Sequence, residues 1–344
     1  MRALGGILIC FLALAPSLRA EEPAGRQENV AFPDYSPLAS SAELARRGDT
    51  SLASDALFTK VARAHERLIE RQFVPEEERY VLYVPPDMPP DGYALLVFVP
   101  PWDRPWLPAG WDRIFDLFGV IFISAGNSGN DRNIFSRREP LALNAAEAVR
   151  KRYKINPAKI FVGGFSGGSR TAERLAVAYP DLFKGAYLAA GSDRIGNRDL
   201  AVPPKDLFHR FQEESRVVFS TGERDAVNIA LDRDTQISFE EYCVFGHTFQ
   251  EVAGIGHAVP TTGGLKQALR WLFDPQPADP ARLAACRANL DREVAAALSE
   301  VRALQDKGDL DAARAALTEL DEKYGGLAAP ESLELARVLD PEHH

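Results

Sequence analysis

The sequence predicts an α/β fold in which a mostly parallel, doubly wound sheet lies between helices. Three observations support this prediction. Short, continuously apolar runs alternate with amphipathic runs of helical length, as expected for strands that are buried on both faces. The apolar run from Lys159 to Gly163 leads into the turn Gly164 to Gly168, Gly-Phe-Ser-Gly-Gly, and then into a helix-like run. After Phe273 the composition changes to Ala, Leu, Glu and Arg, which predicts an additional helical segment.

Length and charge limit the classes of function. The chain has 344 residues, enough for one large α/β domain with an appendage. Its hydrophobic fraction of 46% is typical of a globular protein, and its net charge is −9. Because the chain is acidic and has no long basic run, we expect no nucleic-acid partner.

Residues 1–20 have the pattern of a secretory signal peptide. Arg2 precedes an apolar segment from Leu4 to Ala15, and a cleavage point follows Ala20. The segment is too short to cross a bilayer and no other stretch is suitable, so we expect no integral membrane span. These features predict a secreted or periplasmic protein. A retained N-terminal anchor is the alternative.

A linker and one helix are expected over residues 21–78. Residues 21–50 are rich in Pro, Ser, Ala and charged residues, which is typical of a linker. Apolar residues recur at helical spacing within residues 55–73, which predicts an amphipathic helix: Leu57, Val61, Ala64 and Leu68.

The main domain is expected over residues 79–274. Because its predicted strands and helices alternate, the sheet should be mostly parallel. The predicted strands cover residues 80–84, 93–99, 120–123, 159–166, 185–190, 216–220 and 248–252. The predicted helices cover about residues 141–153, 169–179, 234–245 and 264–273.

A C-terminal helical hairpin is predicted over residues 281–340. Gly308 to Leu317 resembles the turn and second helix of a tetratricopeptide unit, although repeat stacking needs several such units. The hairpin must bury its apolar face, either on the main domain or on a partner protein. Nearby, Cys243 and Cys286 form either a disulfide or two buried thiols.

Ser166, at the centre of the Gly-rich turn, is the candidate nucleophile. Small residues on both sides permit a strained turn that exposes the hydroxyl beside amide N–H groups. A serine hydroxyl also needs a base and a group that orients the base. Asp225 and His257 each follow a predicted strand, where active-site loops lie. Glu223 is a weaker candidate acid because it is too close to its strand. His247 is a weaker candidate base because it begins one.

The tetrahedral intermediate of acyl transfer needs N–H donors for its oxyanion. The natural first donor is the N–H of Gly167, the residue after the nucleophile. The second should come from the loop after residues 93–99. There Pro100 and Pro101 have no N–H, so Trp102 is the first available donor.

Candidate substrate-binding residues follow three strands: Trp102, Asn127 and Asp193. Trp102 belongs to an aromatic cluster with Trp106 and Trp111. This cluster either holds an aromatic or sugar group or fills a small core under a long loop. The acidic residues in these loops lack ligand-type spacing and a neighbouring histidine, so no metal is expected. We expect no cofactor.

Several segments between Tyr93 and Leu272 resemble the α/β-hydrolase superfamily, and within it the secreted esterases that include polyhydroxybutyrate depolymerases and feruloyl esterases. These segments are Leu141 to Ala145, Tyr153 to Pro157, Gly164 to Gly168, Ala178 to Phe183 and Gly254 to His257. The resemblance implies an α/β-hydrolase fold with Ser166 as nucleophile, His257 as general base and then acid, and Asp225 as the orienting carboxylate. The chain departs from this group at Asn156, where Asp is usual, and in lacking a His-Gly dipeptide in the oxyanion loop.

These features predict a secreted serine esterase that forms an acyl-enzyme from a small-molecule or polymeric ester. One alternative is a catalytically weak hydrolase-fold protein used for binding, suggested by the unusual loop from Pro100 to Trp102. The other is a peptidase of the same fold, because a Ser-His-Asp triad does not distinguish esters from amides.

Overall fold

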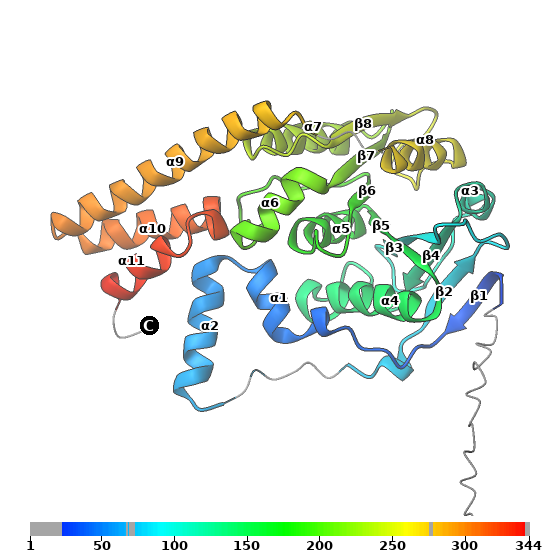
Figure 1. Cartoon of the computed structure of the whole chain (residues 1–344), viewed down its shortest axis with the longest axis horizontal. Coiled ribbons are helices and arrows are strands. Elements are labelled where there is room, and N and C mark those ends of the chain that lie inside the picture. The colour runs from blue at the N-terminus through cyan, green and yellow to red at the C-terminus, as the bar shows by residue number, and fades with distance from the viewer. Residues whose placement is uncertain (1–22, 67, 69–72, 275–277, 341–344) are drawn as a thin grey trace, which may run out of the picture.

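An eight-stranded sheet runs through the described part of the molecule (Figure 1). The structure is a computed structural model that describes residues 23–66, 68, 73–274 and 278–340. The predicted signal peptide, residues 1–20, therefore lies outside the described residues.

The strand order is β1-β2-β4-β3-β5-β6-β7-β8. β2 is antiparallel to its neighbours β1 and β4, whereas the strands from β4 to β8 are parallel. The strands are β1 (Gly25–Val30), β2 (Tyr80–Val84), β3 (Tyr93–Val99), β4 (Val120–Ala125), β5 (Ile155–Phe165), β6 (Gly185–Ala189), β7 (Arg216–Gly222) and β8 (His247–Val252). This order, with a Gly-x-Ser-x-Gly turn after the central β5, decides the fold. The chain has the α/β-hydrolase fold.

Helices cover both faces of the sheet because its strands are apolar on both faces. In β3, Leu95 and Val97 pack into one core cluster, and Leu96 and Phe98 pack into the other. One face is covered by α3 (Trp111–Phe118) and α8 (Thr262–Phe273). The opposite face is covered by α4 (Glu139–Arg152), α5 (Gly167–Ala178), α6 (Lys205–Glu214) and α7 (Ala226–Glu241).

The N-terminal region is more ordered than the predicted linker over residues 21–50. It contains β1, which pairs along the edge of β2, and the helix α1 (Ser41–Gly48). The sequence of β1 is polar, so only its pairing with β2 makes it a strand. The next helix, α2 (Ser51–Arg63), begins earlier and ends earlier than the predicted 55–73. It begins there because the Thr50 side chain accepts a hydrogen bond from Ala53 N.

The C-terminal segment forms three helices where a hairpin was predicted: α9 (Pro280–Asp306), α10 (Leu310–Tyr324) and α11 (Glu331–Leu339). Their apolar residues join the same core cluster as one face of the sheet, including Leu290, Leu298, Leu317 and Leu335. α10 and α11 also pack against α2, so the C-terminal helices lie beside a helix from the N-terminal region (Figure 1). A disulfide joins Cys243, after α7, to Cys286 on α9.

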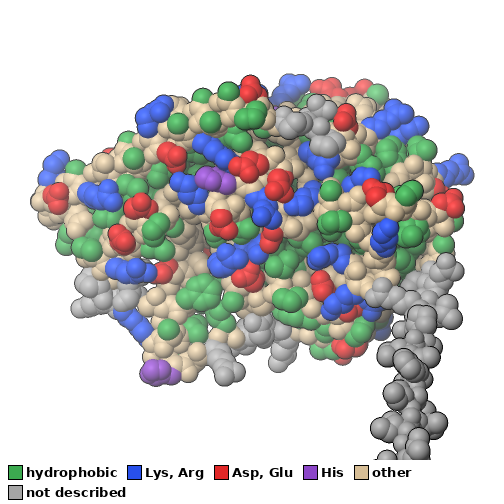
Figure 2. Space-filling model, viewed as in Figure 1, with side chains coloured by type: hydrophobic (Ala, Val, Ile, Leu, Met, Phe, Trp, Pro, Cys, Tyr) green, Lys and Arg blue, Asp and Glu red, His purple; other side chains and the backbone are tan. Residues whose placement is uncertain are grey.

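The visible surface carries both signs of charge. Figure 2 shows acidic and basic side chains interspersed over this face, with no large field of one sign. Among the described residues, no helix combines the length and apolar character needed to cross a membrane.

Candidate active site

Ser166 lies in a strained turn between β5 and α5. Its φ of 55° and ψ of −123° are unusual for a residue with a side chain. Two glycines allow this turn, since a Cβ on Gly164 would overlap the carbonyl of Gly168, and one on Gly168 would overlap the carbonyl of Val99. The start of α5 therefore passes directly against the ends of β5 and β3.

Ser166, His257 and Asp225 form a continuous chain of polar contacts. His257 Nε2 lies 3.0 Å from Ser166 Oγ, and His257 Nδ1 lies 2.6 Å from Asp225 Oδ2. The His257 side chain is 44% exposed, whereas that of Asp225 is 8% exposed. The imidazole is thus open to a substrate on one side and held by a buried carboxylate on the other.

Parallel pairing of β7 and β8 brings the Asp225 and His257 loops together. The pairing extends past the strand ends, where Glu223 N donates to Val252 O at 3.1 Å and Arg224 N donates to Ile255 O at 3.1 Å. The weaker candidate acid, Glu223, is exposed.

The weaker candidate base, His247, lies at the opposite end of β8 from His257. Its ring packs against Phe219 and Phe239, and its Nε2 lies 3.3 Å from a carboxylate oxygen of Glu240. These contacts place it in the packing between β8 and α7.

Asn228 is a site residue that the sequence analysis missed. Asp225 caps α7, and Asn228 Nδ2 donates to its two carboxylate oxygens at 3.0 and 2.8 Å. Burial raises the pKa of Asp225, but the hydrogen bonds from His257 and Asn228 outweigh it, so the net pKa lies below the usual value. Asp225 is a preferred N-cap residue and so indicates a helix start in the sequence, but no sequence pattern indicates the contact from the Asn228 side chain.

The two predicted oxyanion donors both lie beside the nucleophile turn. Gly167 is the first residue of α5, so its N–H is free of the helix ladder. Trp102 packs its ring against Phe165 at a centroid distance of 6.1 Å, and Phe165 packs against His257 at 4.9 Å. Within the described part of the chain, the Trp102 N–H has no hydrogen-bond partner.

The predicted aromatic cluster divides into two parts. Trp102 and Trp106 lie together, with ring centroids 5.3 Å apart, beside the triad. Trp111 is 1% exposed and belongs to the core between α3 and the sheet, where its Nε1 donates to Pro260 O.

The other two predicted substrate-binding residues contact neighbouring segments of the protein. Asp193 forms an ion pair with Arg170 at 2.6 Å. Arg170 lies on α5, about one helical turn after Ser166. Asn127 is exposed, and its backbone N donates to Asp103 O at 2.7 Å. In the Asn127 loop, the side chain that reaches the nucleophile turn is that of Asn130, which lies against Gly167.

A buried carboxylate lies behind this site. Asp232 on α7 is 1% exposed and accepts hydrogen bonds from Ser192 Oγ, at 2.6 Å, and from Thr221 Oγ1. Burial raises its pKa to about 6, against the lowering effect of the two hydroxyl groups. It connects the loop after β6 to the end of β7.

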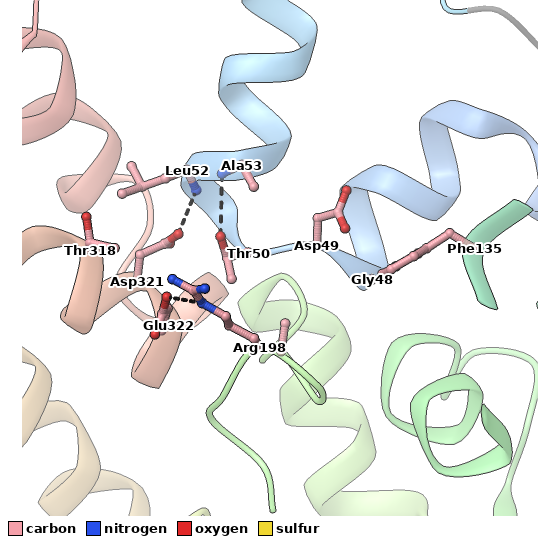
Figure 3. A pocket seen from close by; sticks show the side chains of 11 residues that line it. Gly48, Asp49, Thr50, Leu52, Ala53, Phe135, Arg198, Thr318, Asp321 and Glu322 are labelled. Atoms are coloured by element: carbon pink, nitrogen blue, oxygen red, sulfur yellow. Dashed lines mark hydrogen bonds and ion pairs between the residues drawn. The ribbon is translucent and has the colours of Figure 1, made fainter. Parts of the chain in front are cut away.

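A separate hollow of about 410 Å³ lies where α2, α10 and the loop after β6 meet (Figure 3). Its polar residues hold these segments together, since Leu52 N donates to Asp321 Oδ2 at 3.0 Å and Arg198 pairs with Glu322 at 2.6 Å. Within the described residues, no three His, Cys, Asp or Glu side chains gather so as to hold a metal ion.

No protein-family model matches this chain, and no curated protein sequence matches it. Solved structures resemble it in fold. A protein assigned as a dipeptidyl aminopeptidase IV from Bacteroides ovatus is 16% identical with a TM-score of 0.42, over 60% of this chain and 34% of that chain. The present chain thus matches about a third of that protein.

Two esterase structures are matched over more of their length. An acetyl xylan esterase from Aspergillus awamori is 14% identical with a TM-score of 0.42, over 58% of this chain and 95% of that chain. Est1E from Butyrivibrio proteoclasticus is 13% identical with a TM-score of 0.42, over 57% of this chain and 94% of that chain. At this distance, only the residues of the present chain indicate its chemistry.

Proposed function

We propose that this protein is a serine hydrolase that cleaves carboxylic esters through an acyl-enzyme. The observation that carries the proposal is the unbroken contact chain from Ser166 Oγ through His257 to Asp225. A hydroxyl beside an imidazole that is itself held by a carboxylate is the arrangement that activates serine as a nucleophile.

In the first half of the proposed reaction, Ser166 Oγ attacks the ester carbonyl carbon while His257 Nε2 takes the hydroxyl proton. The carbonyl oxygen becomes an oxyanion, which the N–H groups of Gly167 and Trp102 stabilise. His257 then gives its proton to the leaving alcohol as the C–O bond breaks. In the second half, a water molecule attacks the acyl carbon while His257 takes a proton from that water. The bond between the acyl carbon and Ser166 Oγ then breaks, His257 returns the proton to Ser166 Oγ, and the carboxylic acid is released. Asp225 holds the imidazole in the productive tautomer throughout.

The oxyanion loop favours esters over amides. Amides have the poorer leaving group, so their cleavage depends more on stabilisation of the tetrahedral intermediate. Here the loop begins with Pro100 and Pro101, which supply no N–H donor. The substrate is proposed to be a small-molecule or polymeric ester, with Trp102 and Trp106 beside its acyl or alcohol group.

An oxidising compartment, outside the cytosol, is proposed from two features. The disulfide between Cys243 and Cys286 is typical of secreted and periplasmic proteins. The apolar segment from Leu4 to Ala15 has the pattern of a signal peptide. Sequencing the N-terminus of the protein exported by its host would test this part of the proposal.

The proposed function is tested with Ser166→Ala and p-nitrophenyl acetate. The variant should lose at least about a thousandfold in kcat/KM, because the nucleophile is absent. Ser299→Ala, at an exposed position on α9, is the matched control and should keep the activity of the parent. A fluorophosphonate probe should label Ser166 in the parent, as located by mass spectrometry. A folded parent protein that is neither active nor labelled would support the binding alternative. Faster cleavage of peptide amides than of esters would support the peptidase.

A further inference from the structure

We propose that the side-chain amide of Asn130 is a third donor to the oxyanion, supplied by the loop after β4. This inference rests on the proposed function, because it assigns a role in the same acyl transfer. It follows from how the loops after β3 and β4 place this side chain, and from the backbone donors that Pro100 and Pro101 in the loop after β3 lack.

The loop after β4 is tied to the oxyanion loop along most of its length. Asn130 N donates to Pro101 O at 3.0 Å, and Gly129 N donates to Asp103 Oδ1 at 2.9 Å. The buried Arg138 joins the same two loops, because its guanidinium donates to Pro100 O at 3.1 Å and to Ser128 O at 3.0 Å. The position of Asn130 is therefore set by the loop that carries Trp102.

The Asn130 carboxamide lies directly against the nucleophile turn. It occupies the space where a side chain of Gly167 would stand: a Cβ there would overlap Asn130 Oδ1 and lie 3.0 Å from Asn130 Nδ2. The Asn130 amide therefore lies beside Gly167, the residue whose N–H is the first proposed oxyanion donor. Within the described residues, this amide has no hydrogen-bond partner, and Asn130 is exposed. Its two N–H groups are thus available to a substrate.

The chemistry of the oxyanion loop explains the need for this donor. Pro100 and Pro101 leave Trp102 as the first backbone N–H after β3. A neutral side-chain amide with free N–H groups is a suitable further donor, because it stabilises developing negative charge without needing to change protonation.

The other polar residues of this loop do not have this arrangement. Arg132 is paired with Asp103 at 2.7 Å, and Asp131 is an acid, which would repel an oxyanion. Asn127, the substrate-binding residue expected from the sequence, contributes its backbone N–H to the loop contact with Asp103.

The test compares Asn130→Ala and Asn130→Asp with the parent on p-nitrophenyl acetate and p-nitrophenyl butyrate. Asn130→Ala should lower kcat by about 10²-fold, the size found for loss of one oxyanion donor, with little change in KM. Asn130→Asp keeps the shape of the side chain but places a negative charge beside the oxyanion, so its kcat should fall further. Both losses should be similar for the two esters, because the oxyanion is common to them. Affinity for phenylboronic acid, which forms a tetrahedral adduct with serine, should fall with kcat.

Asp131→Asn, at the exposed neighbouring position, is the matched control and should keep the kcat of the parent. Thermal unfolding of each variant verifies that it is folded. An active parent whose two Asn130 variants keep its kcat would overturn this inference alone. So would a loss confined to KM or to one of the two esters. A parent without Ser166-dependent turnover would overturn the proposed function and this inference together.

Discussion

Asp225 shows how single residues prepare this site. Its carboxylate accepts hydrogen bonds from His257 at 2.6 Å and from Asn228 at 2.8 and 3.0 Å. These bonds keep the carboxylate ionised, and they direct one of its oxygens at the imidazole. Asn228 is therefore a positioning residue: its amide holds Asp225 and also lies 3.1 Å from His257 Nδ1.

Asp225→Asn should lower kcat/KM on p-nitrophenyl acetate by about 10⁴-fold. The carboxamide fits the same space but no longer selects the tautomer of His257 that accepts the Ser166 proton. Glu223→Gln, two residues earlier and exposed, is the matched control and should have the activity of the parent. The reverse outcome, with Glu223→Gln impaired and Asp225→Asn active, would assign the acid to Glu223.

Asp232→Asn should change how the stability of the protein depends on pH. The pKa of Asp232 is raised to about 6 in the folded protein from 3.8, so the folded state binds the extra proton and the parent loses stability as pH rises between these values. The variant has no such loss. From pH 4.5 to 7.5, its free energy of unfolding should therefore rise relative to the parent by about 2 kcal/mol.

Urea unfolding of both proteins at the two pH values measures this change. Asp234→Asn, at an exposed position on the same helix, is the control for the general effect of removing a charge. If the free energies of unfolding of Asp232→Asn and the parent differ by the same amount at both pH values, the raised pKa of Asp232 is contradicted.

At the scale of elements, the decisive unit is the strand–turn–helix of β5 and α5. The sequence identified it because glycine is required wherever another backbone passes this closely, and the Gly-x-Ser-x-Gly motif has glycines at those positions. The edge strand β1 has no such sequence pattern. Its residues, Gly25–Val30, are polar, and its conformation depends on pairing with β2.

Gly164→Ala should destabilise the protein by about 1–3 kcal/mol, because its Cβ overlaps the backbone of Gly168. It should also remove fluorophosphonate labelling of Ser166, since the turn must shift. Gly263→Ala is the matched control: the new Cβ would lie 3.6 Å from Thr261 Oγ1, an ordinary contact, and alanine favours the helix by up to about 1 kcal/mol. Equal effects of the two substitutions on urea unfolding would contradict this account of the turn.

At the scale of the whole molecule, the C-terminal helices are part of the same folded unit as the sheet. Leu290 and Leu317 share a core cluster with β3 and β5, and α10 and α11 pack on α2. The disulfide closes a loop with a sequence separation of 43 between Cys243 and Cys286. Joining these segments restricts the unfolded chain, which stabilises the folded state.

Cys286→Ser should lower the free energy of unfolding by roughly 2–4 kcal/mol. The parent measured with a reducing agent should show a similar loss, whereas the variant should be insensitive to reduction. Ser166 labelling should persist below the unfolding transition, because the triad is built on β5, β7 and β8. Unchanged stability in both experiments would show that the disulfide does not stabilise the protein.

The sequence by itself determined the strands of the main domain in order, its helices other than α3 and α6, the nucleophile turn and the candidate triad. These features are local: apolar runs, glycines at required positions, and polar residues just after strands. Parallel strands bring such residues to one edge of the sheet, so Ser166, Asp225 and His257 could be grouped from the sequence.

The tertiary structure decided what depends on contacts between distant segments. It made β1 a strand, added α11, joined Cys243 to Cys286, and placed Asn130 against Gly167. These outcomes depend on partners that are remote in the chain, so no local pattern of residues specifies them.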